Sequence, residues 1–541
     1  MKLNCCFRYY LIIIILLSIA IPSCKSIKGV SIDKGGYLFE NQTDGEKYFV
    51  KIDTVYGRCV GGKSYLVNKE LVMCPERFEI EIFRRKARLM MQDTTFIVYK
   101  IKSKSSGVCG GWFLLDGMKD KKLFALSQYE IGDYQDFKGR YKDEVFEVEK
   151  ITDVSYANVK GFWSSMPDDT IDMGGIFKTG LINSLKKKDL SLDMDVYIPK
   201  DDTLSQRPLM MFIHGGAFFI GDKATVPYQK WCSHFASLGY VCVSINYRMG
   251  FRPNAQSIER TAYQAAQDAH AAMRYLVSKK DIYRINPDFL FVGGASAGSI
   301  TAMNLAYMRN ENRLKSSYSS LLQDDLGNLE SSGNKIYNKF RIKAVANMWG
   351  AMYDLKVLEN SKASIISFHG DEDMILPYGF GYPFNTIGDL QKVFFGQMYG
   401  SQCIHERAQE LGIRSELHTF HGQGHSLHLD HNRQLNENFY TIQNEIVDFF
   451  YDELIPHPAY IIQDNNDSQL FMIDTTNVSF SDWNVVGGLS IEESLGEIRA
   501  SWFDDEQVQE LRVSGCYKNG AGFEDVFVIK NVKQNESNSH K

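Results

Sequence analysis

A serine between two glycines is the first candidate for chemistry in this chain of 541 residues. The segment 294–298, Gly-Ala-Ser-Ala-Gly, follows an apolar run at 289–292 and precedes a helix-like run from Ile300. It fits the G-x-S-x-G pattern, in which a serine on a sharp strand-to-helix turn attacks a carbonyl carbon. Alone the match is weak, because a surface turn of small residues has the same appearance. The nucleophile hypothesis for Ser296 therefore depends on the partners that the chain supplies.

An upstream segment, 212–218 with the sequence Phe-Ile-His-Gly-Gly-Ala-Phe, ends another apolar run. Glycines let the backbone turn its N–H groups toward a ligand, which suits an oxyanion hole. We predict that the N–H groups of Gly215 and Gly216 form this hole with that of Ala297, the residue after the serine. The alternative is an ordinary Gly-Gly turn at the end of a strand.

An acid and a base are expected downstream of the serine. The segment 367–373, Ser-Phe-His-Gly-Asp-Glu-Asp, closes a further strand and offers three carboxylates. We predict that Asp373 orients the imidazole and stabilises its cation, with Asp371 as the alternative. The base is predicted to be His425, in the turn after the final strand. It lies in a segment crowded with imidazoles: His418, His421, His425, His428 and His431.

The crowded histidines also allow a second interpretation, because imidazoles are good zinc ligands. No carboxylate or cysteine stands beside them at ligand spacing, so we predict neither a metal nor a cofactor.

A net charge of −6 and a pI near 6.1 likewise give no sign of the basic patch that nucleic-acid binding requires.

The elements that must position these residues alternate between strands and helices from Pro208 onward. Such alternation predicts a mostly parallel sheet covered by helices on both faces. Expected strands are 209–213, 240–245, 289–292, 342–348, 364–368 and 416–420, and expected helices are 227–238, 257–279, 299–309, 401–411 and 435–454. Ser296, Asp373 and His425 each follow a strand, so all three should meet at the carboxyl edge of one sheet. Their order along the chain is that of the α/β-hydrolase fold.

Residues from about 150 to 455 resemble the carboxylesterase/lipase-type α/β hydrolases. The resemblance rests on the two glycine motifs, the segment 368–373, the Gly424-His425 turn and Ser-Ile-Asn-Tyr-Arg at 244–248. It implies a cofactor-free serine esterase that works through an acyl-enzyme. One departure is Ala217, where relatives of the hormone-sensitive-lipase type often carry a third glycine. Asn246, Tyr247 and Arg248 are expected to support the site structurally.

Two β-rich modules are predicted to flank this catalytic domain, at 28–148 and 457–535, where short strands alternate apolar and polar residues. A structural accessory is the main interpretation of the first module, and a glycan- or partner-binding surface is the alternative. Within the catalytic domain, 164–190 has the composition of an insertion. The polar stretch 310–339 is expected to be a lid-like or surface insertion.

The N-terminus resembles a bacterial lipoprotein signal. Lys2 and Arg8 flank the start of an apolar run at 11–21, which ends in Ile-Pro-Ser-Cys-Lys at 21–25. We expect residues 1–23 to be removed and Cys24 to be lipidated, anchoring the exported protein to a membrane, either periplasmic or at the cell surface. Ordinary cleavage nearby and an uncleaved anchor are the alternatives.

The substrate is expected to be a small-molecule or glycan-linked ester, and acylated glycans would suit an enzyme displayed at a surface. A peptidase on the same scaffold is one alternative, although the sequence has no sign of a site for a peptide amine. The other is a surface binding protein whose hydrolase domain has lost its activity. The acyl and alcohol groups and the oligomeric state are not encoded in these motifs.

Overall fold

The computed structural model describes the backbone of strands between residues 35 and 129 and most of the chain from 139 to 531. Within the latter stretch, 167–185, 203, 253, 322, 456 and 504–507 lie outside the described residues. The chain divides into two compact units, Gly139–Pro456 and a unit comprising Met1–Lys138 with His457–Lys541. The predicted signal segment and Cys24 lie outside the described residues, so lipidation stays a prediction.

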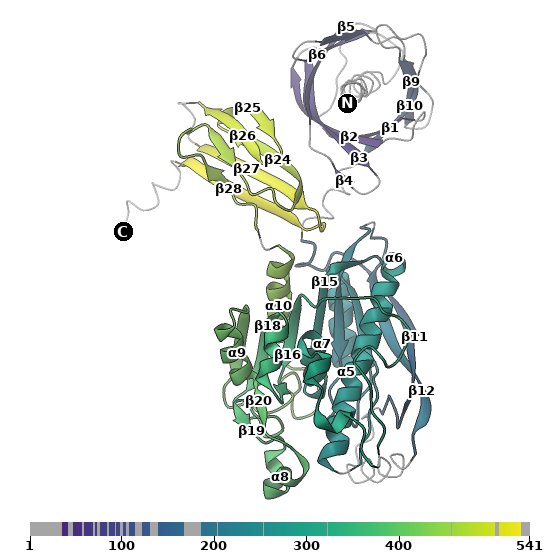
Figure 1. The fold of residues 1–541 in the computed structure, drawn as a ribbon. Helices are drawn as coiled ribbons and strands as arrows, with labels where there is room; N and C mark the ends of the chain where they lie inside the picture. Colours follow the sequence, from purple (N-terminus) through teal and green to yellow (C-terminus); the bar gives the residue numbers. More distant parts are fainter. Residues whose placement is uncertain are drawn as a thin grey trace, which may run out of the picture. The chain divides into compact units, whose positions relative to one another are not determined.

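An eight-stranded sheet forms the centre of the unit Gly139–Pro456, with the strand order β11-β12-β14-β13-β15-β16-β18-β21 (Figure 1). The first pairings, β11 with β12 and β12 with β14, are antiparallel, and all the others are parallel. The prediction of a mostly parallel sheet is therefore confirmed. The strands are β11 Val148–Gly161, β12 Lys188–Pro199, β13 Arg207–Ile213, β14 Val241–Ile245, β15 Ile285–Ala295, β16 Ala344–Met348, β18 Ser364–Gly370 and β21 Ser415–Phe420.

Helices cover both faces of this sheet, as strands that are apolar throughout require. On one face, Phe212 of β13 stacks on Trp231 of α4 at 5.5 Å, and Phe291 of β15 stacks on Phe450 of α10 at 4.5 Å. On the other face, alternate residues of the same strands share a core with α5, α7 and α9. The helices are α4 Val226–Ser237, α5 Ala255–Ser278, α6 Lys280–Tyr283, α7 Ala297–Tyr307, α8 Gln391–Phe394, α9 Ser401–Glu410 and α10 Glu437–Leu454.

The carboxyl edge of the sheet brings distant parts of the chain together. Strand β13 lies between β14 and β15, so the chain leaves it toward one side and later returns on the other. Open parallel sheets bind ligands at such a switch point, outside the carboxyl ends of the strands. The segment after β13 and the turn after β15 are therefore neighbours, and the loops after β18 and β21 follow along the same edge. A small three-stranded sheet, β17 Ala351–Met352, β20 Met398–Gly400 and β19 Phe380–Gly381, also belongs to this unit.

This unit begins at Gly139, about ten residues before the boundary near 150 predicted from the sequence. The reason is a buried ion pair, in which both terminal nitrogens of Arg140 donate to the carboxylate of Asp202, at 3.0 and 2.7 Å. Arg207, at the start of β13, donates to the same carboxylate at 2.6 Å. The side chains of Arg140 and Asp202 are 3% and 1% exposed, so this pairing holds the segment before β11 inside the unit.

The insertion predicted at 310–339 is attached firmly to helix α5. Arg260 donates to the carbonyl oxygens of Ser316 and Asp324, both at 2.6 Å, and Gln267 donates to that of Leu326 at 2.7 Å. These contacts hold the insertion against α5, and its interpretation as a lid-like or surface insertion stays a prediction. Most of the other predicted insertion, 164–190, lies outside the described residues.

The unit comprising Met1–Lys138 and His457–Lys541 is built of strands in the parts that are described. Its N-terminal strands form one ten-stranded sheet, and the C-terminal strands form a four-stranded and a three-stranded sheet. The first set is β1 Gly35–Asn41, β2 Lys47–Tyr56, β3 Cys59–Asn68, β4 Leu71–Val72, β5 Glu76–Phe83, β6 Lys86–Met91, β7 Thr94–Ile97, β8 Ile101–Ser103, β9 Val108–Phe113 and β10 Lys122–Tyr129. The second is β22 Ile462–Gln463, β23 Leu470–Met472, β24 Val478–Val486, β25 Gly488–Ser494, β26 Glu497–Trp502, β27 Val508–Tyr517 and β28 Gly522–Asn531. Both stretches are β-rich, as the sequence predicts.

Among the described helices, none combines the length and the apolar character needed to cross a bilayer.

Candidate active site

Ser296 occupies a strained turn between β15 and α7. Its backbone angles are φ 56° and ψ −120°, far from those of either neighbouring element, and such a conformation costs on the order of 1–3 kcal/mol. The glycines of the motif make the turn sterically feasible. A Cβ on Gly298 would lie 2.0 Å from the carbonyl oxygen of Ile213, and one on Gly294 would lie 2.3 Å from the carbonyl carbon of Gly298. The backbone therefore has the geometry of a nucleophile elbow.

His425 lies beside Ser296, in the loop after β21. Its Nε2 is 2.9 Å from Ser296 Oγ, and its Nδ1 is 2.6 Å from Asp373 Oδ2. A carboxylate can only accept, so Nδ1 carries a proton, and the neutral ring then presents the lone pair of Nε2 to the serine hydroxyl. The His425 side chain is 16% exposed.

Asp373 lies in the loop after β18, and its side chain is 0% exposed. Its Oδ1 accepts the N–H groups of Ile375 and Leu376 at 2.7 and 3.1 Å, while Oδ2 faces His425 and also His369, whose Nε2 is 3.2 Å away. Burial alone would raise the pKa of this carboxyl, but the hydrogen bonds from His369 and His425 outweigh it and lower the pKa below its usual range. Asp373 is therefore ionised at neutral pH.

The other candidates near the site have different partners. Asp371, the alternative acid, is 2.8 Å from His421 Nδ1 and accepts the Gly422 N–H at 2.7 Å, so it does not touch His425. His418 stacks on Phe368 at 5.0 Å. Within the described part of the chain, no three histidine, cysteine or acidic side chains are arranged to hold a metal ion.

The structure corrects the prediction for Gly215. Its N–H donates to the hydroxyl of Tyr228 at 3.0 Å, so it is already engaged within the protein. Gly215 instead meets a steric requirement, because a Cβ here would lie 2.8 Å from the carbonyl oxygen of Ala295 and 3.4 Å from Ser296 Cβ. Tyr228 comes from helix α4, and no local signal in the sequence connects it with the glycine motif.

The N–H groups of Gly216 and Ala217 have no acceptor within the described parts of the chain. Both residues, and Phe218 after them, have positive φ angles of 107°, 53° and 60°, which turn the backbone sharply. Ala297 is the first residue of α7, and the first N–H groups of a helix have no intrahelical acceptor. Gly216, Ala217 and Ala297 therefore keep backbone N–H groups that have no acceptor in the described parts of the chain.

Lys223, which the sequence did not single out, and Tyr247, which it did, both support this loop. Lys223 is buried and binds the carboxylates of Asp195 and Asp153 at 2.5 and 2.8 Å, which joins the end of the loop to the sheet edge. Tyr247 donates from its hydroxyl to the carbonyl oxygen of His214 at 2.8 Å. Arg248, in the same predicted supporting segment, forms a buried ion pair with Asp268 at 2.6 Å. These contacts agree with a structural role for the segment 246–248.

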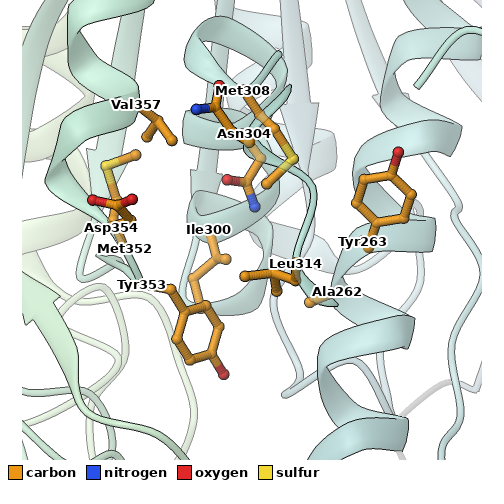
Figure 2. A pocket seen from close by; sticks show the side chains of 11 residues that line it. Ala262, Tyr263, Ile300, Asn304, Met308, Leu314, Met352, Tyr353, Asp354 and Val357 are labelled. Carbon is orange, nitrogen blue, oxygen red and sulfur yellow. The ribbon is translucent and has the colours of Figure 1, made fainter. Parts of the chain in front are cut away.

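A separate pocket with a volume of about 30 Å³ lies between α5, α7 and the chain after β16 (Figure 2). Figure 2 shows Ile300 and Asn304 from α7, with Met308 directly after its end, on one side and Tyr263 from α5 on the other. The lining residues are Ala262, Tyr263, Ile300, Asn304, Met308, Asn312, Leu314, Met352, Tyr353, Asp354 and Val357. Because Ser296, Asp373 and His425 are not among them, we do not assign the pocket to the reaction centre.

Comparison with protein families finds a match between residues 194–376 and the family described as BD-FAE. Curated relatives include the amyloplastic tuliposide B-converting enzyme 1 of Tulipa gesneriana, 29% identical over 22% of this chain and 28% of its own length. The probable carboxylic ester hydrolase LipM of Mycobacterium tuberculosis is 30% identical over 22% of this chain and 25% of its own length. Gut esterase 1 of Caenorhabditis briggsae is 26% identical over 21% and 20%. The chain thus spans about a quarter of the length of the curated relatives it matches.

Solved structures of esterase 2 from Thermogutta terrifontis also match. The form phosphorylated by paraoxon has a TM-score of 0.33 and 20% identity, over 49% of this chain and 90% of that chain. The propionate-bound form has a TM-score of 0.32 and 19% identity, again over 49% and 90%.

Proposed function

We propose that this chain, whose unit Gly139–Pro456 is a carboxylesterase-type α/β hydrolase, cleaves carboxylic esters through a covalent acyl-enzyme on Ser296. The observation that carries the proposal is the unbroken line of hydrogen bonds from Ser296 Oγ through the His425 ring to Asp373, at 2.9 and 2.6 Å. These two contacts join a nucleophile, a base and an orienting acid in the arrangement that serine hydrolases use.

In the first half of the reaction, His425 Nε2 takes the proton of the Ser296 hydroxyl as its oxygen attacks the ester carbonyl carbon. The ring then carries a positive charge, and the ionised Asp373 beside Nδ1 stabilises that charge without taking the proton. His425 next gives its Nε2 proton to the departing alkoxide, and the alcohol leaves. Ser296 remains acylated.

The negative charge that develops on the carbonyl oxygen needs donors that are already oriented. Gly216, Ala217 and Ala297 supply backbone N–H groups for this role, since the Gly215 N–H is engaged by Tyr228. Their orientation is imposed by the positive φ angles of the loop and by the start of α7.

In the second half, a water molecule replaces the alcohol. His425 takes a proton from the water, which attacks the acyl carbon and forms a second tetrahedral intermediate. Collapse of this intermediate releases the carboxylic acid and returns the proton to Ser296 Oγ. His425 carries each proton between Ser296, the departing alcohol and the attacking water in this cycle.

The proposal is tested with the Ser296→Ala variant, a fluorophosphonate probe and p-nitrophenyl acetate. We expect the native chain to be labelled and to release p-nitrophenol, and the variant to do neither. Ser278→Ala is the matched control, because Ser278 lies at the end of α5 and donates only to the carbonyl oxygen of Tyr275. A native chain that is not labelled would instead indicate a binding protein that has lost its activity. Labelling with hydrolysis of aminoacyl amides but not of esters would indicate a peptidase.

Acylated glycans are the substrate class that we propose to test first. An exported enzyme held at a membrane surface would meet such glycans outside the cell, and the BD-FAE match and the esterase relatives are compatible with an ester of this kind. Rates would be compared for acetylated, feruloylated and long-chain acyl esters. A clear preference for long acyl chains would contradict this substrate class.

Lipid anchoring is proposed separately, from the flanking Lys2 and Arg8, the apolar run 11–21 and the residues Ser23, Cys24 and Lys25. Expression in a bacterium fed a labelled fatty acid should give a labelled, membrane-bound protein, and Cys24→Ala should abolish the label. Release of the unlabelled native chain into the soluble fraction would favour ordinary signal cleavage.

A further inference from the structure

The carboxylate of Asp373 faces two imidazoles. His425 Nδ1 is 2.6 Å from Oδ2, and His369 Nε2 is 3.2 Å from the same oxygen. His369 belongs to strand β18 and is 0% exposed, so it cannot touch a substrate. Its presence behind the acid is not needed for the steps described above, and a buried polar ring in this place requires its own explanation.

The proton on the His369 ring can be assigned from its partners. Nε2 faces two acceptors, the Asp373 carboxylate and, at 3.4 Å, the carbonyl oxygen of Leu376. Nε2 therefore carries the hydrogen. On the opposite side of the ring, Nδ1 is 2.7 Å from the hydroxyl oxygen of Ser401, the first residue of α9. In the neutral ring Nδ1 is an acceptor, so the Ser401 hydroxyl donates to it.

A buried network holds Ser401 in that orientation. The side-chain N–H groups of Asn347, in β16, donate to the hydroxyl oxygens of Ser401 and Ser367, both at 3.0 Å. Ser299, in α7, donates to Asn347 Oδ1 at 2.5 Å. All four of these residues are 0% exposed. The Ser401 oxygen accepts from Asn347, and the Ser401 hydroxyl hydrogen has His369 Nδ1 as its acceptor, so every named donor has an acceptor.

We propose that His369 is a positioning residue: an imidazole whose Nε2–H, oriented by Ser401, holds the Asp373 carboxylate in line with His425. The inference rests on the proposed ester hydrolysis and extends it to the support of the acid. The carboxylate then has donors on both oxygens, from two backbone N–H groups on Oδ1 and two imidazoles on Oδ2. Such complete satisfaction fixes both its rotation and its ionised state.

Loss of the His369 donor should change the pH dependence as well as the rate. Without it, the dyad of Asp373 and His425 binds a proton more readily, so the acid limb of the kcat/KM profile moves to higher pH. The other titratable groups that face these rings are His428, near His425, and Tyr378, 5.8 Å from the His369 ring with its hydroxyl bonded to Thr419 at 2.7 Å. Neither changes partners in the variants below.

The first experiment compares His369→Phe with His369→Gln. Phenylalanine keeps the ring volume without the donor, whereas the terminal amide of glutamine can place an N–H close to the position of Nε2. For His369→Phe we expect kcat on p-nitrophenyl acetate to fall about tenfold or more, the range set by a hydrogen bond to a charged group, with KM unchanged. The acid limb should move up by roughly one pH unit. His369→Gln should recover much of both effects.

A second pair of variants keeps the inference testable if His369→Phe does not fold. Ser401→Ala and Ser367→Ala each remove one hydroxyl that Asn347 contacts at 3.0 Å, and both sites are fully buried. Only Ser401 contacts His369. We expect Ser401→Ala to lower kcat about threefold, as the loss of a neutral hydrogen bond would, and to shift the acid limb in the same direction. Ser367→Ala should leave the limb in place.

The outcomes separate the two proposals. If the native chain hydrolyses the ester and Ser296→Ala does not, but the folded His369 and Ser401 variants keep the native acid limb and kcat, the positioning role is wrong and the ester hydrolysis stands. A loss of kcat that is equal in Ser401→Ala and Ser367→Ala, with no shift of the limb, would also overturn it. A native chain that is neither labelled nor active overturns both proposals.

Discussion

Replacing Asp373 by asparagine tests the proton assignments at the site. The N–H groups of Ile375 and Leu376 donate to Oδ1 and cannot reverse, so the asparagine must turn its oxygen toward them. Its NH₂ group then replaces Oδ2 and faces both His425 Nδ1 and His369 Nε2, and the His369 hydrogen keeps the Leu376 carbonyl oxygen as its acceptor. Two donors cannot share the contact with His425, and the His425 imidazole must present a lone pair there and move its hydrogen to Nε2.

The magnitude follows from this change of tautomer. A hydrogen on Nε2 points at Ser296 Oγ, 2.9 Å away, so the ring can no longer accept the serine proton. The same exchange in a chymotrypsin-type triad lowers kcat about 10⁴-fold. At about 1.36 kcal/mol per factor of ten, this corresponds to about 5 kcal/mol of transition-state stabilisation. We expect a loss of this size for Asp373→Asn, with little effect on KM.

The assay is the rate of p-nitrophenyl acetate hydrolysis across pH, with Asp371→Asn as the matched control. Asp371 lies two residues away in the same loop and pairs with His421, whose side chain is 84% exposed. Its substitution should change kcat by no more than about threefold, the small value typical of exposed pairs. An Asp373→Asn variant that retains a tenth of the native rate, or an Asp371→Asn variant that loses it, would refute the reasoning.

Three further results are expected. Gly215→Ala places a Cβ 2.8 Å from the Ala295 carbonyl oxygen. This contact should displace the turn that carries Ser296 and lower kcat by up to about 100-fold, while the circular dichroism spectrum stays native. An unchanged kcat would contradict the close approach. Arg248→Met leaves the fully buried Asp268 carboxylate without its partner. The free energy of unfolding, measured in urea, should fall by about 3–5 kcal/mol. A fall below about 1 kcal/mol would show that the pair contributes little. Burial, together with the nearby charge of His425, lowers the pKa of His428 to about 3, so the unfolded chain binds a proton that the folded chain excludes. The contribution of His428 to stability is complete above the unfolded pKa near 6.5 and declines as pH falls toward 3. The His428→Phe variant should therefore lose less stability than the native chain between about pH 7 and pH 4.5. Equal losses of stability would argue against a neutral, buried ring.

Much of the catalytic unit could be predicted from local patterns. The expected strands 209–213, 289–292 and 364–368 lie within β13, β15 and β18, because long apolar runs bounded by small residues suit the interior of a parallel sheet. The expectation that Ser296, Asp373 and His425 meet follows from the same reasoning, since each comes after a strand and parallel strands end at one edge. The structure brings their side chains within hydrogen-bond distance.

What could not be predicted depends on partners far away in the chain. The Gly215 N–H is engaged by Tyr228, thirteen residues later in α4, and the glycine motif itself contains no trace of that contact. His369 stands inside a motif that was chosen for its carboxylates, but its role depends on Ser401, thirty-two residues onward. Hydrogen bonds between buried side chains are set by tertiary packing, which composition and periodicity do not report.

The buried pairing of Arg140 with Asp202 has a practical consequence for anyone who isolates the catalytic unit. A recombinant fragment cut at residue 150, where the change of pattern in the sequence suggests a start, would lack Arg140 and leave Asp202 with Arg207 as its remaining guanidinium partner. Removing one member of a buried ionic group is among the most destabilising changes a protein can suffer. Fragments intended for crystallisation or for variant libraries should therefore begin at or before Gly139.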